Sequence, residues 1–296
     1  MEVVTLGVAA GPAIRTPEAG IATAVVVNGQ SYLVDFGIGC TRAARTAGLT
    51  GRDFRAGFVT HLHSDHVAEL PAFLLWNWGR PVDGFTTPFT VHGPAPDPRE
   101  GRPRGGTKAM VRSVLDAFSY DIAVRTEDEG RPPLDSLVRV HEITPTDTSG
   151  PIPVYTDEHV TVTAVLVEHP PVFPAFAFRF DTADASVTLS GDTAECEALV
   201  ELAGGTDVLI HEAVALDYYR DRGFDSAFLR HQERSHTTPQ GAGRIARRAG
   251  ARRLVLSHLA GIAPPEYWRR SAEETFDGPV SVASSGDRFV VSPPSD

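Results

Sequence analysis

The chain has 296 residues, of which 42% are hydrophobic and 22% are charged, and it holds only two cysteines, Cys40 and Cys196. This composition suffices for a packed core and excludes wholesale disorder and a disulfide framework. A net charge of −11 argues against nucleic acid as a partner. The sequence shows neither an apolar leader nor an apolar run of about 18 residues, so we expect a cytoplasmic protein with no membrane partner.

The first half of the chain is predicted to mix strands and helices. Two β-rich runs within residues 21–35 flank Asn28-Gly29, the strongest short hairpin signal. A glycine-rich turn at residues 35–39 follows. The further elements expected here are a helix at 43–47, a strand at 58–60, a helix at 67–76, a strand at 91–94, a loop at 95–106, a helix at 108–120 and a loop at 126–135.

The second half is predicted to be richer in strands. Alternating or wholly apolar runs predict strands at residues 160–168, 176–180, 186–189, 208–210 and 254–256. A helix is expected at residues 239–249, with Pro239 in its first turn. No linker, composition break or repeat divides the chain, so we expect a single domain over residues 1–296.

Histidine and aspartate side chains directly follow several of these strands. Strand ends on one rim of a sheet are where ligands gather, and histidine with carboxylate suits zinc, and also manganese or iron. After the strand at 58–60 comes the hexapeptide His61-Leu62-His63-Ser64-Asp65-His66, and the later strands are followed by His169, Asp192, His211 and His258.

The spacing within the hexapeptide suits two metal ions. His61 and His63 are two residues apart and point the same way in an extended segment, whereas Asp65 and His66 follow a turn and can face a second ion. A carboxylate bridges metals at roughly 3.5–4 Å separation. Such a dense cluster is costly to bury unless positive charge pairs with it. The histidines without such a context are His92, His141, His159 and His231.

The motif His61-x-His63-x-Asp65-His66 resembles the signature of the metallo-β-lactamase superfamily. More closely, the chain resembles the branch that holds ribonuclease Z, ribonuclease-Z-like phosphodiesterases and zinc arylsulfatases. The resemblance implies an α/β (α+β) fold, a four-layer αββα sandwich. The supporting segments are Leu6-Gly7, Asp35-x-Gly37-x-Gly39, residues 174–181, Ser190-Gly191-Asp192-Thr193, His211-Glu212-Ala213, residues 235–239 and Ser257-His258.

The resemblance also implies two divalent metal ions, zinc in the first place, with manganese or iron as alternatives. It assigns His61, His63 and His169 to one metal, Asp65, His66 and His258 to the other, and Asp192 to a bridge between them. His236 corresponds to a histidine that protonates the leaving oxygen. His211 and Glu212 correspond to a motif under the site, with Glu212 either orienting His236 or serving a structural purpose.

The chain departs from ribonuclease Z in one segment. That enzyme inserts a long basic arm for transfer RNA before the bridging aspartate, whereas here residues 170–191 hold a single Arg179. We therefore expect a small-molecule ester and no nucleic acid as substrate. The expected reaction is cleavage of a phosphodiester or sulfate ester by a metal-bridging hydroxide, which Asp65 holds or deprotonates while His236 protonates the leaving group.

Other functions stay open at this point. Members of the same superfamily hydrolyse lactones and other acyl compounds, and a specialised reaction of secondary metabolism would use the same ligands. A metal-binding scaffold without activity is the non-enzymatic alternative, but the full set of ligand residues speaks against it. The resemblance also leaves room for a homodimer.

Overall fold

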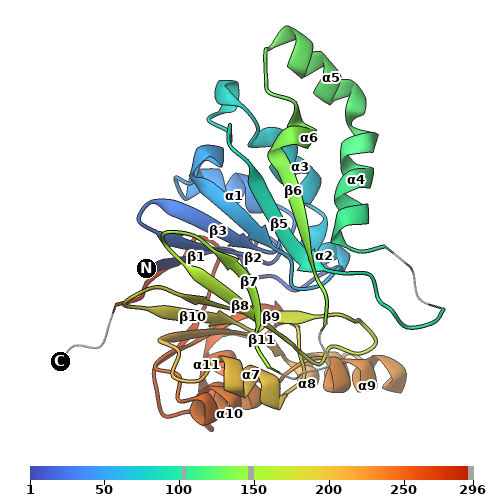
Figure 1. Ribbon diagram of the computed structural model, residues 1–296. Coiled ribbons are helices and arrows are strands. Elements are labelled where there is room, and N and C mark those ends of the chain that lie inside the picture. The colour runs from blue at the N-terminus through green and yellow to red at the C-terminus, as the bar shows by residue number, and fades with distance from the viewer. Residues whose placement is uncertain (102–104, 146–149, 293–296) are drawn as a thin grey trace.

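The computed structural model describes residues 1–101, 105–145 and 150–292. Part of the loop predicted at 95–106, namely residues 102–104, lies outside the described residues. The strands gather in two mixed sheets, one formed mainly by each half of the chain (Figure 1).

The first sheet has seven strands in the order β14-β1-β2-β3-β4-β5-β6. Its β14, β1, β2 and β3 pair antiparallel, and β3, β4, β5 and β6 pair parallel. The Asn28-Gly29 turn joins β2 and β3 as predicted, with both residues at positive φ. The bounds are β1 Glu2–Gly7, β2 Ala22–Val27, β3 Gln30–Val34, β4 Phe54–Phe58, β5 Phe89–Pro94, β6 Val138–Ile143 and β14 Arg288–Val290.

The second sheet repeats this plan in the order β13-β12-β11-β10-β9-β8-β7. Here β7 to β10 pair antiparallel and β10 to β13 pair parallel. The bounds are β7 Ile152–Thr156, β8 Thr161–Leu166, β9 Phe176–Asp181, β10 Ser186–Leu189, β11 Val208–Val214, β12 Leu254–Ala260 and β13 Val280–Val282.

Helices cover the outer face of each sheet, which makes four layers (Figure 1). On the first sheet lie α1 Cys40–Thr46, α3 Leu70–Trp76 and α4 Thr107–Ala117; on the second lie α7 Glu197–Leu202, α10 Pro239–Ala249 and α11 Pro265–Glu273. The predicted αββα sandwich is therefore confirmed. The remaining helices are η1 Gly51–Asp53, α2 Ser64–Val67, η2 Arg80–Val82, α5 Ser119–Asp128, α6 Leu134–Leu137, α8 Leu216–Asp221 and α9 Ser226–Ser235.

Side-chain alternation in β9 explains how the layers are held together. Phe176, Phe178 and Phe180 recur every second residue, so they share the face turned toward the first sheet, while Ala177 packs under the helices. Across the sheet interface the ring of Phe58 meets that of Phe180 edge to face, with centroids 5.2 Å apart. This apolar core fixes the two sheets relative to each other, and with them the rim that carries the polar residues.

Several element boundaries differ from the predictions. The helix predicted at 67–76 is divided into α2 and α3, with Pro71 in the first turn of α3. The loop predicted at 126–135 begins inside α5 and ends inside α6. The edge strands β6, β7, β13 and β14 and the N-terminal β1 were not predicted. No helix among the described residues is long and apolar enough to cross a membrane.

Candidate metal centre

The predicted ligands lie on one rim, where the two sheets meet. Strands β8, β10, β11 and β12 run in the same direction, so their carboxyl ends share one edge. The first sheet reaches this edge just after β4, where the Phe176 amide donates to the Thr60 carbonyl at 2.9 Å. The segments that end there carry the hexapeptide, His169, Asp192, His211 and His258.

Asp192 lies at the centre of the cluster. Its Oδ2 atom is 3.4 Å from Nε2 of His66. The same oxygen is 4.0 Å from Nε2 of both His61 and His169. Its Oδ1 atom is 3.3 Å from Nδ1 of His258. One carboxylate therefore faces imidazoles from both sheets.

Two groups of side chains that share no residue have ligand atoms within 4.8 Å of one another, and a third such group, Asp192, His236 and His258, overlaps both. Asp192 belongs to the first group and also approaches the second. The structure therefore brings together all seven residues predicted as ligands, and their roles as ligands stay predictions. The first group is His61, His63, His169 and Asp192, and the second is Asp65, His66 and His258.

The unpartnered atoms of the cluster fit a divalent cation. Each buried polar atom without a hydrogen bond costs about 1–3 kcal/mol. Coordination by a cation would satisfy imidazole nitrogens and carboxylate oxygens together, and this donor set is typical of zinc. The buried atoms without a hydrogen-bond partner in the cluster are Nε2 of His61, Nε2 of His66, Oδ1 of Asp192 and Nδ1 of His258.

Burial keeps part of the cluster ready to bind a cation. Desolvation lowers the pKa of His61 well below its ordinary value and lowers the pKa of His169 to about 4, so both rings are neutral at neutral pH. Burial alone would raise the pKa of Asp192, but the charges of His258 and His66 outweigh it and hold that pKa well below the usual range. Neutral imidazole and ionised carboxylate are the states that coordinate metal. Burial lowers the pKa of His66, but Asp192 and Asp35 outweigh it and raise that pKa well above its ordinary value, so a cation would displace the proton of this ring.

Asp35 orients one of these histidines from behind. Its Oδ2 atom lies 2.8 Å from Nδ1 of His66, so that Nε2 of His66 faces the cluster. Asp35 is buried and also accepts hydrogen bonds from the amide and the hydroxyl of Thr60, both at 2.8 Å. The sequence prediction assigned no role to Asp35. In the sequence, Asp35 is marked only by the turn motif Asp35-x-Gly37-x-Gly39. In the structure, the backbone of Asp35 has a positive φ of 62°.

Backbone groups orient two further members of the cluster. Nδ1 of His169 donates to the Ser235 carbonyl at 2.8 Å. The amide of Gly11 donates to Oδ2 of Asp65 at 2.9 Å, and a Cβ at Gly11 would lie 2.2 Å from the Asp65 Cβ. Only glycine therefore permits this approach. These contacts join segments far apart in the sequence and have no local pattern from which to predict them.

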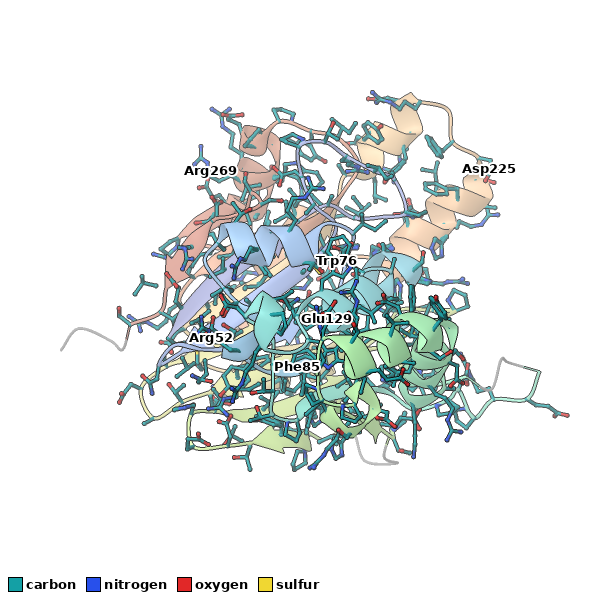
Figure 2. The ribbon with its side chains drawn as sticks, turned by 90° about the horizontal axis from the view of Figure 1, so that it is seen from above. Arg52, Trp76, Phe85, Glu129, Asp225 and Arg269 are labelled. Carbon is teal, nitrogen blue, oxygen red and sulfur yellow. The ribbon has the colours of Figure 1, made fainter. Side chains whose placement is uncertain are left out.

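Helix α9 delivers His236 to the edge of the cluster. The helix begins after Asp225, whose carboxylate accepts from the Phe228 amide at 2.8 Å and which lies at the periphery in Figure 2. Its opposite end is at Ser235, so His236 is the first residue beyond it. The Nδ1 atom of His236 lies 4.0 Å from Oδ2 of Asp192.

Glu212, in β11, contacts His236 through its carboxylate. Its Oε1 atom lies 2.9 Å from Nδ1 of His236 and accepts from the Thr193 amide at the same distance. Glu212 is 2% exposed. Burial lowers the pKa of His236, but the Glu212 carboxylate outweighs it and raises that pKa to about 9 before any metal charge is added. His236 is thus able to carry a proton beside the cluster.

The remaining histidines lie outside these groups. His92 stacks on His141 with centroids 5.0 Å apart, and also on Phe58, between β5, β6 and the sheet interface. His159 is near Asn28. The ring of His231 comes within 6.0 Å of the His236 ring. None of them belongs to a metal-competent group within the described ranges.

Open space adjoins the cluster on the side of Asp65. A hollow of about 250 Å³ lies there, and Arg15 contributes to its wall. The Arg15 guanidinium donates to the carbonyl of Leu259, next to His258, at 2.8 Å. Space for a substrate and a fixed cation thus lie beside the candidate ligands. The lining also includes the acidic Glu18, together with Gly11, Pro12, Ile14, Ile38, Ser64 and Ala68.

Residues 32–259 match the family described as "Beta-lactamase superfamily domain". A protein named Ribonuclease Z from Mycobacterium bovis is 33% identical over 297 residues, 99% of each chain. Among solved structures, human tRNase Z, short form, has a TM-score of 0.68 at 22% identity and covers 98% of this chain and 99% of its own. The metallo-beta-lactamase fold protein YhfI from Bacillus subtilis has a TM-score of 0.67 at 21% identity, covering 97% and 98%.

The expectation that nucleic acid is not a partner is wrong, because the chain aligns with relatives named Ribonuclease Z, and the expected small-molecule ester is not confirmed. The relative from Mycobacterium bovis is named Ribonuclease Z, and the alignment covers 99% of both chains. A protein of this length therefore carries that name. Net charge misled because it averages over the whole surface, whereas the charge that a phosphate meets is set locally at the cluster. The short segment of residues 170–191 misled for a second reason, since it concerned one arm and not the site.

Proposed function

The chain belongs to the β-lactamase superfamily and is a metal-dependent hydrolase, and from this premise we propose that it cleaves phosphodiester bonds in RNA. Two observations support the proposal together. The first is that the chain aligns over its length with proteins named Ribonuclease Z. The second, which carries the mechanism, is that Oε1 of buried Glu212 lies 2.9 Å from Nδ1 of His236 beside the ligand cluster.

We propose that the cluster holds two divalent cations, with zinc as the metal favoured by its histidine-rich donor set. Asp192 stands between the two groups and would serve both ions, which its distances to His66 and His258 support. The first ion would be held by His61, His63 and His169, and the second by Asp65, His66 and His258.

Bound there, the ions would supply Lewis-acid activation of water and would offset the negative charge of a phosphodiester. The protein's own groups complete the reaction. Asp65, fixed by the Gly11 amide, has an oxygen at the edge of the hollow and would orient the attacking water. The ring of His236 would give its proton to the departing ribose oxygen, since Glu212 occupies Nδ1 and leaves Nε2 for the substrate.

The acidic composition does not oppose this proposal. RNA binding requires positive charge where the phosphate lies, and cations in the cluster with Arg15 at the hollow would provide it there. Removal of the ions should then abolish both cleavage and much of the RNA affinity.

A panel of substrates tests the proposal. An unprocessed transfer-RNA transcript and bis(p-nitrophenyl) phosphate are compared with p-nitrophenyl sulfate and a simple lactone. We expect turnover of the RNA and of the phosphodiester, lost on chelation and restored by zinc. Turnover of the sulfate or the lactone alone would reject the phosphodiesterase assignment and leave the hydrolase class intact.

A further inference from the structure

A second hollow lies on the outer side of α1 and α3 and adjoins the hollow beside Asp65. Its volume is about 780 Å³. Ile38, which is 54% exposed, lines both hollows, so they meet at this side chain. We call the second hollow the α1–α3 groove and define it by Ile38, Arg42, Glu69, Ala72, Trp76 and Arg80.

An exposed tryptophan stands in this groove. Trp76 is 71% exposed, whereas the other two tryptophans of the chain, Trp78 and Trp268, are 0% and 2% exposed. Tryptophan is highly buried on average, so a ring left in solvent is an unusual feature. Its place among the helices of the first sheet can be followed in Figure 2.

The two faces of α3 explain why this ring is exposed. Phe73 and Leu74 are buried in the core beneath the helix. Glu69, Ala72 and Trp76 are spaced three and four residues apart, so they share the outer face and line the groove. The methyl group of Ala72 occupies little space beside the ring. A flat aromatic surface is therefore open to a ligand in the groove.

Positive charge without an acidic partner lies beside the ring. Arg42 and Arg80 are exposed, and within the described ranges neither makes an ion pair or a side-chain hydrogen bond. Glu69 is directed at the first turn of α1, where its Oε2 accepts from the Gly39 amide at 3.0 Å and its Oε1 from the Thr41 amide at 3.4 Å. This carboxylate therefore neutralises neither arginine by contact.

The second carboxylate in the wall is shared by two further arginines. Asp83 lies 2.9 Å from Arg52 and 3.6 Å from Arg45, both measured between guanidinium nitrogen and carboxylate oxygen. Four arginines thus surround two carboxylates here. The groove is locally basic on a chain whose net charge is −11.

The groove begins next to the ligand cluster. Ala68 lines the hollow beside Asp65, and Ala72 and Trp76 follow in the groove at steps of four residues. At 1.5 Å per residue the helical path from Ala68 to Trp76 is roughly 12 Å. A strand of nucleic acid advances about 3.4 Å per stacked nucleotide and more when extended, so it would cover this distance in roughly two to four nucleotides.

An open aromatic ring beside unpaired arginines is the combination that binds single-stranded nucleic acid. Bases stack on the ring regardless of sequence, and guanidinium groups contact the phosphates. A second copy of the chain fits less well, because a symmetric contact brings a patch against itself and would set Arg42 and Arg80 against an equally basic surface. The charge and the path to the cluster both favour RNA.

We propose that the α1–α3 groove binds single-stranded RNA that flanks the scissile phosphate, with a base stacked on Trp76 and phosphates held by Arg42 and Arg80. The assignment of this RNA as the substrate rests on the proposed function. Binding in the groove rests only on the ring, the arginines and the space between them. Recognition there tolerates any sequence, because stacking and phosphate contacts do not read base edges.

Tryptophan fluorescence tests binding without reference to cleavage. Zinc-loaded protein is titrated with an oligouridylate of about 12 nucleotides and read directly after mixing. Since Trp78 and Trp268 are buried, we expect quenching of the emission from Trp76. Trp76→Phe should lose the quenching and keep the affinity for a fluorescein-labelled oligouridylate, whereas Trp76→Leu should bind it about tenfold more weakly.

The salt dependence of the same affinity tests the arginines. Each phosphate contact on a single strand contributes about 0.7 to the slope of log Kd against log salt, so Arg42→Gln and Arg80→Gln should each lower the slope by about that amount. The matched controls are Tyr120→Leu, an exposed aromatic in α5, and Arg112→Gln, an exposed arginine in α4. Neither residue lines the groove.

Two results would overturn the groove proposal. One is equal affinity for the oligouridylate in Trp76→Leu and Tyr120→Leu, with the slope unchanged in both groove arginine variants. The other is a wild-type dimer in sedimentation equilibrium that Trp76→Leu converts to a monomer with unchanged affinity for the oligouridylate, which would make the groove an interface between copies.

Kinetics on two substrates separates this proposal from the proposed function. In Trp76→Leu the ratio of kcat/KM on the transfer-RNA transcript to kcat/KM on bis(p-nitrophenyl) phosphate should fall about tenfold, because only the RNA has flanking nucleotides. If wild type cleaves RNA and this ratio is the same in Trp76→Leu and Tyr120→Leu, the groove is rejected and the function stands. If the oligouridylate binds as expected and wild type cleaves neither substrate, the function fails while the groove stands.

Discussion

The Nδ1 atom of His236 lies 2.9 Å from Oε1 of Glu212, which fixes this histidine against a buried carboxylate at the edge of the ligand cluster. The pair joins the strand β11 to the residue that follows α9, so two segments with no local relation meet at the site.

Substitution of His236 should affect substrates according to their leaving groups. In His236→Ala, cleavage of RNA should fall about 10²–10⁴-fold, because the ribose oxygen needs a proton to depart. Hydrolysis of bis(p-nitrophenyl) phosphate should change little, since p-nitrophenolate leaves without one. His231→Ala is the control, as its ring lies 6.0 Å from that of His236 and outside the cluster. An equal loss on both substrates would contradict proton donation by His236.

Glu212→Gln should shift the pH dependence of RNA cleavage. The carboxylate raises the pKa of His236, so its removal lowers that pKa. The protonated ring is the active form, and activity declines as pH rises through its pKa. The alkaline limb of the kcat profile should therefore move to lower pH in the variant. A limb that stays in place, measured with the same metal content, would show that the limb reports another group.

Asp35→Asn should weaken metal binding without removing a ligand. Asp35 holds Nδ1 of His66 at 2.8 Å, and loss of such an orienting partner typically costs 10–100-fold, so about that factor is expected in zinc affinity. Competition with a chromogenic chelator measures it. Asp157→Asn serves as the control, because Asp157 also accepts side-chain hydrogen bonds, partly buried ones from Tyr32 and Tyr155, but away from the ligand cluster. Equal affinities in the two variants would contradict the role of Asp35.

The sheet interface should dominate stability. Phe178 is fully buried there, with its ring centroid 5.5 Å from that of Phe58. Phe178→Ala should lower the free energy of unfolding by about 3–5 kcal/mol in urea titrations. Phe118, at 41% exposure, provides the comparison, and Phe118→Ala should cost far less. Similar costs for both would mean that the interface contributes less than its burial indicates.

The cluster could be predicted from sequence because its residues obey a local rule. His61 to His66, His169, Asp192 and His258 each follow a short apolar run, and chain direction brings such strand ends to one edge. Asp35 and Gly11 could not be predicted, because their roles exist only where a turn approaches a distant side chain. Strand β1 and the edge strands depend on partners far along the chain, as in the pairing of Val3 with Phe289.

The prediction that nucleic acid is not a partner failed for a different physical reason. Net charge describes the chain as a whole and the length of residues 170–191 describes one segment, but recognition of a phosphodiester depends on charge within a few ångströms of the site. The role of Glu212 likewise depends on a local contact that the sequence does not reveal. The sequence left its purpose open between orienting His236 and a structural one, and only the 2.9 Å contact places it against that ring.

Metal analysis of the purified protein tests the central claim most directly, with wild type and Asp192→Asn compared after zinc supplementation and removal of free ion. We expect about two metals per wild-type chain, since each group of ligands would hold one, and markedly fewer in Asp192→Asn, together with loss of RNA cleavage. Wild-type protein that is folded, binds no divalent metal and still cleaves RNA would contradict the account.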